Sequence, residues 1–168
     1  MKKPFVSVLI GSDSDLPTMQ ETVKVLDKFG IRKELRVTSA HRTPAATHEY
    51  VKDADQRGCA VFIAAAGLAA HLAGTVAGLT VKPVIGVPMD SGPLDGLDAL
   101  LSTVQMPGGI PVATMAIGKA GAKNAGYLAA QILARQDPVL ERKLAKERDE
   151  NAKAILKKND TIRNKLNK

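Results

Sequence analysis

Three short segments of the chain gather side chains that can bind anions and move protons. The first, Gly11 to Asp15 (GSDSD), alternates hydroxyls with carboxylates, whereas Ser39 to Pro44 (SAHRTP) and Gly67 to Leu72 (GLAAHL) each contain a histidine. Hydroxyls and an arginine suit a phosphate, a carboxylate can accept hydrogen bonds from a ribose diol, and histidine exchanges protons near neutral pH. Together the segments predict a site for a nucleotide-like ligand with acid–base chemistry.

The first segment has more polar groups than one helix cap needs. Ser14 or Asp15 could cap the helix that follows, because Pro17 suits a first helical turn. Capping is therefore the structural alternative for each residue. Since Ser12 and Asp13 add two further polar side chains, we expect the loop to hold a ligand as well.

The second and third segments supply the candidates for catalysis. Arg42 is either a surface charge or a planar donor to phosphate, and His41 beside it is the leading acid–base candidate. His71 is either a buried, hydrogen-bonded histidine or a second member of the site. His48 is expected to be exposed or structural, and Cys59 to be a core residue without the features of a reactive thiolate.

Several motifs are absent from the sequence. No G-x-G-x-x-G follows the first apolar run, no G-x-x-x-x-G-K-[ST] occurs, and Cys and His are not spaced as metal ligands. A dinucleotide enzyme and a P-loop ATPase are disfavoured. We therefore expect no metal and no cofactor, and a reaction that depends on proton transfer and positioning.

Apolar runs and helical patterns alternate along the chain, which predicts the elements that position these segments. Four buried strands and one more polar edge strand are expected at 5–10, 60–66, 83–88, 111–117 and 33–39. Helices are expected at 17–29, 44–57, 69–79, 94–103 and 120–134, with a long charged helix beyond Asp137. This alternation predicts an α/β fold, a flavodoxin-like three-layer α/β/α sandwich with a five-stranded parallel sheet, whose ligands bind where the strands end.

The length fits one domain, with 1–137 as the catalytic domain and 138–168 as a helix that extends it. Ten Lys or Arg and five Asp or Glu in 138–168 account for +5 of the net charge of +7. Because the basicity lies mostly in this helix, and the chain has three Phe, two Tyr and no Trp, nucleic acid is not an expected partner.

The chain shows no pattern of secretion or membrane insertion. The apolar run after MKKP is short and lacks a cleavage site, and the uncharged stretch 59–81 is mostly Ala and Gly with a histidine inside it. A single cysteine cannot form an internal disulfide. A cytoplasmic location is expected.

Five segments resemble the 5-(carboxyamino)imidazole ribonucleotide mutase family of purine biosynthesis, in its bacterial form. They are GSDSD (11–15), SAHRTP (39–44), GLAAHLAG (67–74), GLDALLSTVQMPGGIPVAT (96–114) and AIGKAGAKNAGYLAAQIL (116–133). The likeness runs from about Phe5 to Leu133, and the first two motifs are the specific ones.

The resemblance implies a cofactor-free isomerisation. The carboxylate on the exocyclic amine of the substrate moves to ring carbon 4 through enclosed carbon dioxide, and a histidine shuttles the proton. By motif match that catalytic histidine is His41. Six residues would bind the substrate or line its pocket: Ser12, Ser14, Asp15, Ser39, Arg42 and His71.

The resemblance also implies a homo-octamer with shared active sites. The chain departs from the family at Ala65 and Leu68, where glycine is usual, and at Ala73, where proline is usual. The apolar stripe of the last helix (Leu140, Leu144, Ile155, Ile162 and Leu166) could dock on neighbours or could stay solvated. Two alternatives to the mutase are a related carboxylase of another ribonucleotide and a non-catalytic nucleotide- or flavin-binding module.

Overall fold

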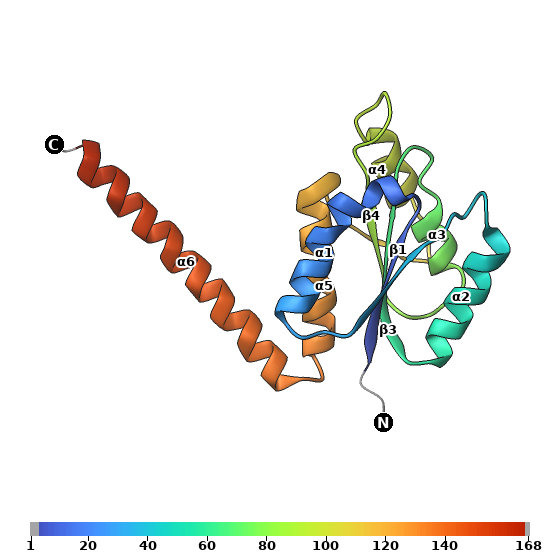
Figure 1. The fold of residues 1–168 in the computed structure, drawn as a ribbon, viewed down its shortest axis with the longest axis horizontal. Helices are drawn as coiled ribbons and strands as arrows, with labels where there is room; N and C mark the ends of the chain where they lie inside the picture. The colour runs from blue at the N-terminus through green and yellow to red at the C-terminus, as the bar shows by residue number, and fades with distance from the viewer. Residues whose placement is uncertain (1–3, 167–168) are drawn as a thin grey trace. The chain divides into compact units, whose positions relative to one another are not determined.

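The computed structural model describes residues 4–166. These divide into two compact units, with the boundary between Ile132 and Leu133. The first unit alternates strands and helices along the chain (Figure 1). Its elements are β1 (Phe5–Ile10), the short 3-10 turn η1 (Asp13–Asp15), α1 (Leu16–Lys28), β2 (Lys33–Val37), α2 (Pro44–Gln56), β3 (Cys59–Ala66), α3 (Leu72–Ala77), β4 (Val84–Pro88), α4 (Leu97–Val104), β5 (Ala113–Thr114) and most of α5 (Gly118–Ala134).

The five strands form one parallel sheet in the order β2-β1-β3-β4-β5. Ile10 pairs with Val37 of β2 on one side and with Ala65 of β3 on the other, so these three strands end at nearly the same level. The order reverses direction after β2, and the crevice beside such a reversal is where ligands bind in sheets of this kind. The prediction of a flavodoxin-like α/β/α sandwich is confirmed.

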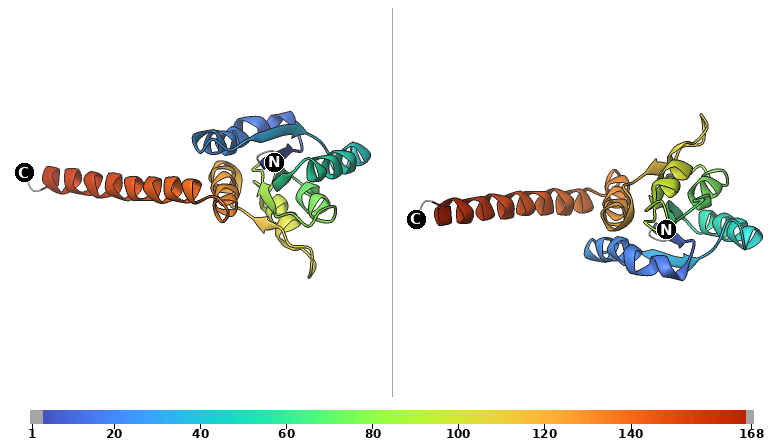
Figure 2. Two further views of the ribbon diagram at one scale, coloured as in Figure 1. Left: turned by 90° about the horizontal axis from the view of Figure 1, so that it is seen from below. Right: turned by 90° about the horizontal axis from the view of Figure 1, so that it is seen from above.

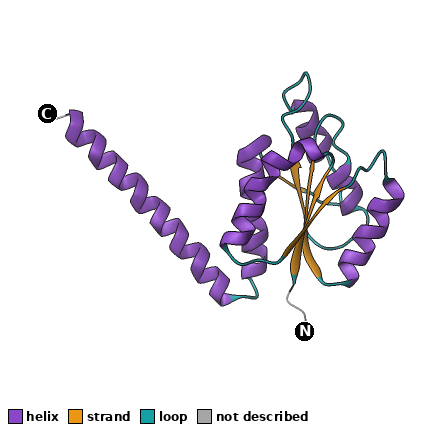
Figure 3. Ribbon diagram, in the orientation of Figure 1, coloured by secondary structure: helices purple, strands orange, loops and turns teal. Residues whose placement is uncertain are grey.

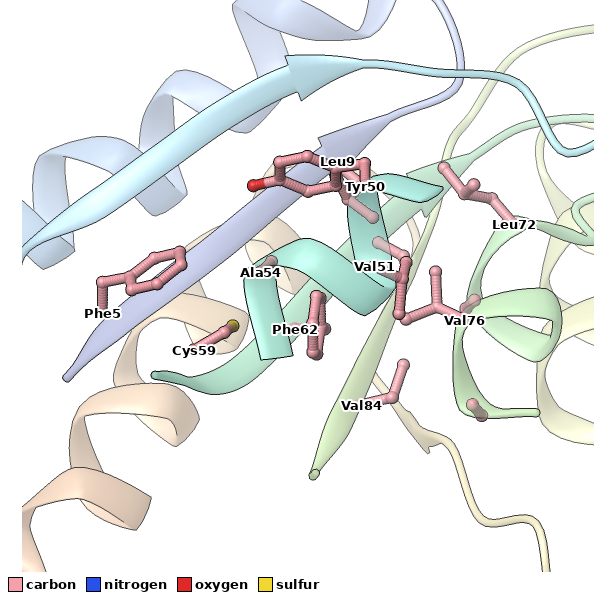
Figure 4. Close-up of a cluster of buried hydrophobic side chains, with 13 residues drawn as sticks. Phe5, Leu9, Tyr50, Val51, Ala54, Cys59, Phe62, Leu72, Val76 and Val84 are labelled. Atoms are coloured by element: carbon pink, nitrogen blue, oxygen red, sulfur yellow. The ribbon is translucent and has the colours of Figure 1, made fainter. Parts of the chain in front are cut away.

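Helices cover both faces of the sheet: α1 and α5 lie on one side, and α2 and α3 on the other (Figures 2 and 3). Strands buried on both faces are expected to be continuous apolar runs, and every residue of β1 is buried. Figure 4 shows the core on the α2 and α3 side, a cluster that includes Phe5 and Phe62 of the sheet and Val51 and Val76 of the helices.

The helices α1 and α5 pack unusually closely at Gly126. The Thr22 hydroxyl donates a 2.6 Å hydrogen bond to the Ala122 carbonyl across this contact. A β-carbon at position 126 would lie 2.9 Å from Val25 Cβ and 3.1 Å from the Thr22 carbonyl oxygen. Glycine is required here because the backbone of α5 comes so near to α1.

Three elements are shorter than the sequence predicts. The sequence predicts β5 over 111–117, but this strand pairs with β4 only at Ala113 and Thr114. Pro111 and Pro88 lack the backbone N–H that a longer ladder would need. α3 and α4 begin three residues later than expected. Asp95, with a positive φ of 49°, lies inside the expected α4 and interrupts it, whereas Leu68 (φ 55°) lies just before the expected start of α3.

The second unit is dominated by α6 (Pro138–Leu166), the long charged helix that the sequence predicts. Asp137 caps it, accepting hydrogen bonds from the backbone N–H of Val139 and Leu140 at 3.0 and 3.1 Å. In the predicted stripe, Leu140 is buried and Leu144 half-buried, whereas Ile155, Ile162 and Leu166 are exposed.

Among residues 4–166, no helix combines the length and the apolar character that a membrane span requires.

Candidate active site

A cavity of about 560 Å³ opens at the carboxyl ends of β1, β2 and β3. All seven residues predicted for the site line it, namely Ser12, Ser14, Asp15, Ser39, His41, Arg42 and His71. The other lining residues are Gly11, Ala40, Ala66, Gly67, Leu68, Ala69, Leu72 and Ser91. The structure thus brings three loops together as the strand order requires, and the functional role of each residue stays a prediction.

The first loop is held in shape by its own hydroxyls. Ser12 caps the 3-10 turn, accepting from the Ser14 backbone N–H at 3.3 Å and from the Ser14 hydroxyl at 2.9 Å. The Ser12 hydroxyl in turn donates to Asp13 Oδ1 at 3.2 Å. Both serine hydroxyls are therefore fixed side by side on the cavity wall.

Asp15 is buried, and its side chain makes no capping hydrogen bond to α1. The capping role that the sequence allows for Asp15 is therefore wrong. Burial raises the pKa of its carboxyl above the ordinary value of 3.8, Asp13 and Asp90 add to this, and hydrogen bonds with Ser12 and Ser14 oppose it. A buried carboxyl in a cleft that caps nothing is a candidate for binding a ligand.

The second loop is cross-braced around Ser39. The Ser39 backbone N–H donates to Thr43 Oγ1 at 3.0 Å, and the Thr43 hydroxyl donates back to the Ser39 carbonyl at 3.1 Å. The Ser39 hydroxyl accepts from the Arg42 backbone N–H at 3.1 Å. Arg42 Nη2 then reaches the Gly11 carbonyl at 3.4 Å, so the guanidinium lies beside the first loop.

His41 and His71 meet across the cavity. His41 Nε2 lies 2.7 Å from His71 Nδ1, and the rings are nearly perpendicular, at 82° with centroids 4.8 Å apart. One nitrogen must donate and the other accept at this distance, so the pair shares one proton at the contact. His71 is exposed, and the interpretation of it as a buried histidine is wrong.

The two residues that the sequence leaves out of the site lie outside the cavity. His48 is exposed on α2, as expected. Cys59 is buried at the start of β3, and burial raises the pKa of its thiol to about 11. A thiol of this kind is not a nucleophile at neutral pH.

Sequence reasoning missed Ser91. Ser91 follows β4, whose carboxyl end lies at the same edge of the sheet as the other three, so the rule that found the first three loops would also have found this one. Of the three departures from the expected motifs, Leu68 lines the cavity, whereas Ala65 is buried in β3 and Ala73 in α3.

Comparison with known proteins assigns the chain to a family. The family model described as AIR carboxylase matches residues 5–154. The chain belongs to the AIR carboxylase family. Among its relatives in this family, the N5-carboxyaminoimidazole ribonucleotide mutase of Bacillus subtilis is 51% identical over 160 residues, which is 95% of this chain and 99% of that protein. The mutase of Pyrococcus horikoshii is 55% identical over 143 residues, 85% of this chain and 80% of that protein.

A solved structure with a similar fold is PurE of Treponema denticola, with a TM-score of 0.83 and 30% identity, covering 92% of this chain and 96% of that one. The resemblance drawn from the sequence motifs is therefore confirmed at the level of the family. All three loops of the cavity lie within the stretch that the AIR carboxylase family model covers.

Proposed function

We propose that this chain is an isomerase, a mutase of purine biosynthesis that converts 5-(carboxyamino)imidazole ribonucleotide to 4-carboxy-5-aminoimidazole ribonucleotide. The observation that carries the proposal is a single cavity that joins an arginine, a buried carboxyl and a histidine pair, in a chain whose relatives at 51% and 55% identity are mutases of this name.

The reaction needs two bond changes and no net change in protons. The exocyclic C–N bond to the carboxylate breaks, its electron pair stays on nitrogen, and nitrogen gains a proton as carbon dioxide leaves. Ring carbon 4 then attacks carbon dioxide, the new C–C bond forms, and carbon 4 loses its proton. One group that gives a proton and then recovers one completes the cycle.

His41 is the group proposed for this shuttle. Its contact with His71 holds the ring at the cavity wall and supplies a neighbour that can accept or return a proton. Both rings line the cavity.

The polar loops are proposed to hold the ribose phosphate. Ser12, Ser14 and Ser39 offer hydroxyls, and Arg42 offers a planar guanidinium that can form two parallel bonds to phosphate. Asp15 would accept from the ribose diol, which would add to its hydrogen bonds with Ser12 and Ser14 and further offset the burial of its carboxylate.

Assembly and location are part of the same proposal. We place the enzyme in the cytoplasm as a homo-octamer; the buried free cysteine suits a reducing compartment, and the exposed apolar residues of α6 offer surface for contacts between copies.

The test is to incubate the purified chain with the carboxyamino substrate, without ATP and without metal, and to measure the carbon-carboxylated product. Conversion at a rate well above that of an enzyme-free sample supports the proposal. If the product is absent, or forms only when ATP is added, the mutase assignment is wrong. The same assay with a pyridine ribonucleotide separates the mutase from the related carboxylase.

A further inference from the structure

Two buried threonines flank the loop that carries His41 and Arg42. Thr38 directly follows β2 and is 8% exposed, and Thr47 lies near the start of α2 and is fully buried. Their Oγ1 atoms are 2.6 Å apart. The pair therefore joins the two ends of the segment 38–47.

The pair of hydroxyls continues into the backbone of the loop. The Thr47 hydroxyl donates to the Thr43 carbonyl at 3.0 Å and also lies 3.4 Å from the Ser39 carbonyl, and carbonyls only accept. Because Thr47 has one hydroxyl hydrogen and gives it to the backbone, the hydrogen between the two threonines comes from Thr38. The donors thus run from Thr38 through Thr47 to the loop.

Stability of the fold does not explain these hydroxyls. Both carbonyls already accept from backbone N–H groups, Ser39 from Thr43 at 2.9 Å and Thr43 from Thr47 at 3.0 Å. Two valines would have the same shape, and replacing both partners of a buried hydrogen bond in that way is nearly neutral or stabilising. A threonine that bonds the carbonyl four residues back, as Thr47 does, also slightly destabilises its helix.

The loop itself lacks other anchors in the core. No residue from 39 to 46 is buried, so Thr38 and Thr47 are the first buried residues on either side of it. The loop nevertheless has to hold two side chains in place, since His41 Nε2 lies 2.7 Å from His71 Nδ1 and the Arg42 guanidinium lies beside the first loop.

We infer that Thr38 and Thr47 are positioning residues of the proposed mutase, a buried hydroxyl clamp that holds His41 and Arg42 in place for the reaction. The inference rests on the proposed function. Neither threonine lines the cavity, so the clamp acts through the loop and not by touching the substrate. A loop without the clamp can still fold, but misplacing a reacting group by about 1 Å can lower a rate about 100-fold.

The experiment separates each hydroxyl from the space that it fills. Thr47→Val keeps the shape and removes the hydroxyl, Thr47→Ser keeps the hydroxyl and removes a methyl, and Thr38→Val/Thr47→Val makes the whole pair apolar. Thr22→Val is the control, because the Thr22 hydroxyl is buried and donates to the Ala122 carbonyl outside the cavity. Assays with the carboxyamino substrate give kcat and KM, melting curves give stability, and amide hydrogen exchange of 38–47 gives the opening of the loop.

Activity and stability should rank the variants differently. Turnover of Thr47→Val and of the double variant should fall about tenfold or more, with faster amide exchange in 38–47, whereas turnover of Thr47→Ser stays within about threefold of the unchanged chain. The double variant should melt at or above the temperature of the unchanged chain, and Thr47→Ser below it, because the serine variant loses buried apolar surface. Thr22→Val should lose stability and keep its kcat.

Three outcomes would decide against the clamp or leave one variant to judge it. If kcat follows the melting temperature across the variants, or if the double variant turns over like the unchanged chain, the inference is wrong although the proposed function stands. If Thr47→Val fails to fold, because the Thr38 hydroxyl has lost its nearest partner, the double variant decides alone. A chain that does not convert the carboxyamino substrate at all overturns the proposed function and this inference with it.

Discussion

The carboxyl of Asp15 is buried beside two serine hydroxyls. Its raised pKa means that ionising this carboxyl destabilises the folded chain. Between its ordinary value of 3.8 and the raised value, the folded chain binds more protons than the unfolded chain, so the contribution of this group to stability is present at low pH and is lost as the pH rises. A ligand that donates hydrogen bonds to Asp15 would offset that cost. The residue is thus better arranged for binding than for stability.

Asp15→Asn tests this arrangement. We expect substrate affinity to fall roughly 10- to 100-fold, which corresponds to losing about 1.5–3 kcal/mol for hydrogen bonds to a charged group. The melting temperature at pH 7 should stay equal or rise. Its difference from the unchanged chain should shrink as the pH falls below the ordinary pKa of 3.8, because the carboxyl then becomes neutral in both states. Titration calorimetry and melting curves at several pH values measure both.

The matched control is Asp13→Asn, since Asp13 is exposed and does not line the cavity. The amide oxygen introduced by this substitution can still accept the hydrogen bond from the Ser12 hydroxyl. The affinity of this variant for the substrate should barely change. A parallel loss of affinity and melting temperature in Asp15→Asn would instead assign Asp15 a structural role.

Arg42→Lys tests the phosphate contact. A point charge cannot reproduce a planar two-bond fork, so we expect KM to rise about 10- to 100-fold, equivalent to about 1.5–3 kcal/mol, with kcat affected less. Arg36→Lys is the control, because Arg36 packs over the Tyr50 ring outside the cavity. An unchanged KM in Arg42→Lys would remove this residue from the phosphate site.

His41→Asn and His71→Asn test the proton shuttle. Removing a positioned acid–base group reduces turnover by about 100- to 10,000-fold, so we expect kcat of His41→Asn to fall by that amount while substrate binding is kept. His71→Asn should lose less, because the role proposed for its contact with His41 is to hold that ring in place. Single-turnover rates at saturating substrate separate the two. If His71→Asn loses the larger factor, the shuttle belongs to the third loop.

At the scale of elements, the sequence predicts most of this fold because its signals are local. The apolar run at 5–10 forms β1 with the expected bounds. The helix expected from Pro44 begins at that residue, and the helix expected to end at Ala134 ends there. The late start of α3 could not be predicted, because the positive φ of Leu68 just before it runs against the preference of leucine and accompanies a contact with Gly92 of another loop. The contact of His41 with His71 is likewise set by the order of strands in the sheet and not by spacing along the chain.

Gly126→Ala tests the close packing of α1 on α5. Alanine favours helix over glycine by about 1 kcal/mol, but overpacking a tight interior costs about 1–3 kcal/mol. The new β-carbon would meet Val25 Cβ and the Thr22 carbonyl, and neither can swing aside, so we expect a net loss of up to about 2 kcal/mol in the free energy of unfolding.

Denaturant titration measures that loss. The control is Asn124→Ala on the exposed side of the same helix, which should be neutral or slightly stabilising. If Gly126→Ala is as stable as Asn124→Ala, the two helices are not in the tight contact described.

At the scale of the whole molecule, the long helix α6 differs in character from the rest of the chain. It is highly charged, and pairs such as Lys146–Glu150 and Lys153–Asp149 each add a few tenths of a kcal/mol to a helix. Ile155, Leu156, Ile162 and Leu166 are more than half exposed along it. Burying one such side chain contributes about 1.5–3 kcal/mol, so contacts of these residues with another copy of the chain would stabilise an oligomer.

Truncation after Asp137 tests what α6 does. The sheet and the helices α1 to α5 all lie before that residue, so we expect the shortened chain to fold with a cooperative melting transition and to keep its strand content by circular dichroism. Its oligomers should be smaller or dissociate at higher protein concentration than those of the full chain, because the exposed apolar residues of α6 are lost.

Light scattering over a range of concentrations measures the mass of both chains. An unchanged mass would show that α6 is dispensable for assembly and that the interfaces lie in the first unit, whereas an aggregated product would show that α6 completes the core. A control that replaces only Ile155 and Ile162 with glutamine keeps the helix and removes part of its apolar surface, so a lower mass in that variant would assign the effect to those side chains rather than to the length of the chain.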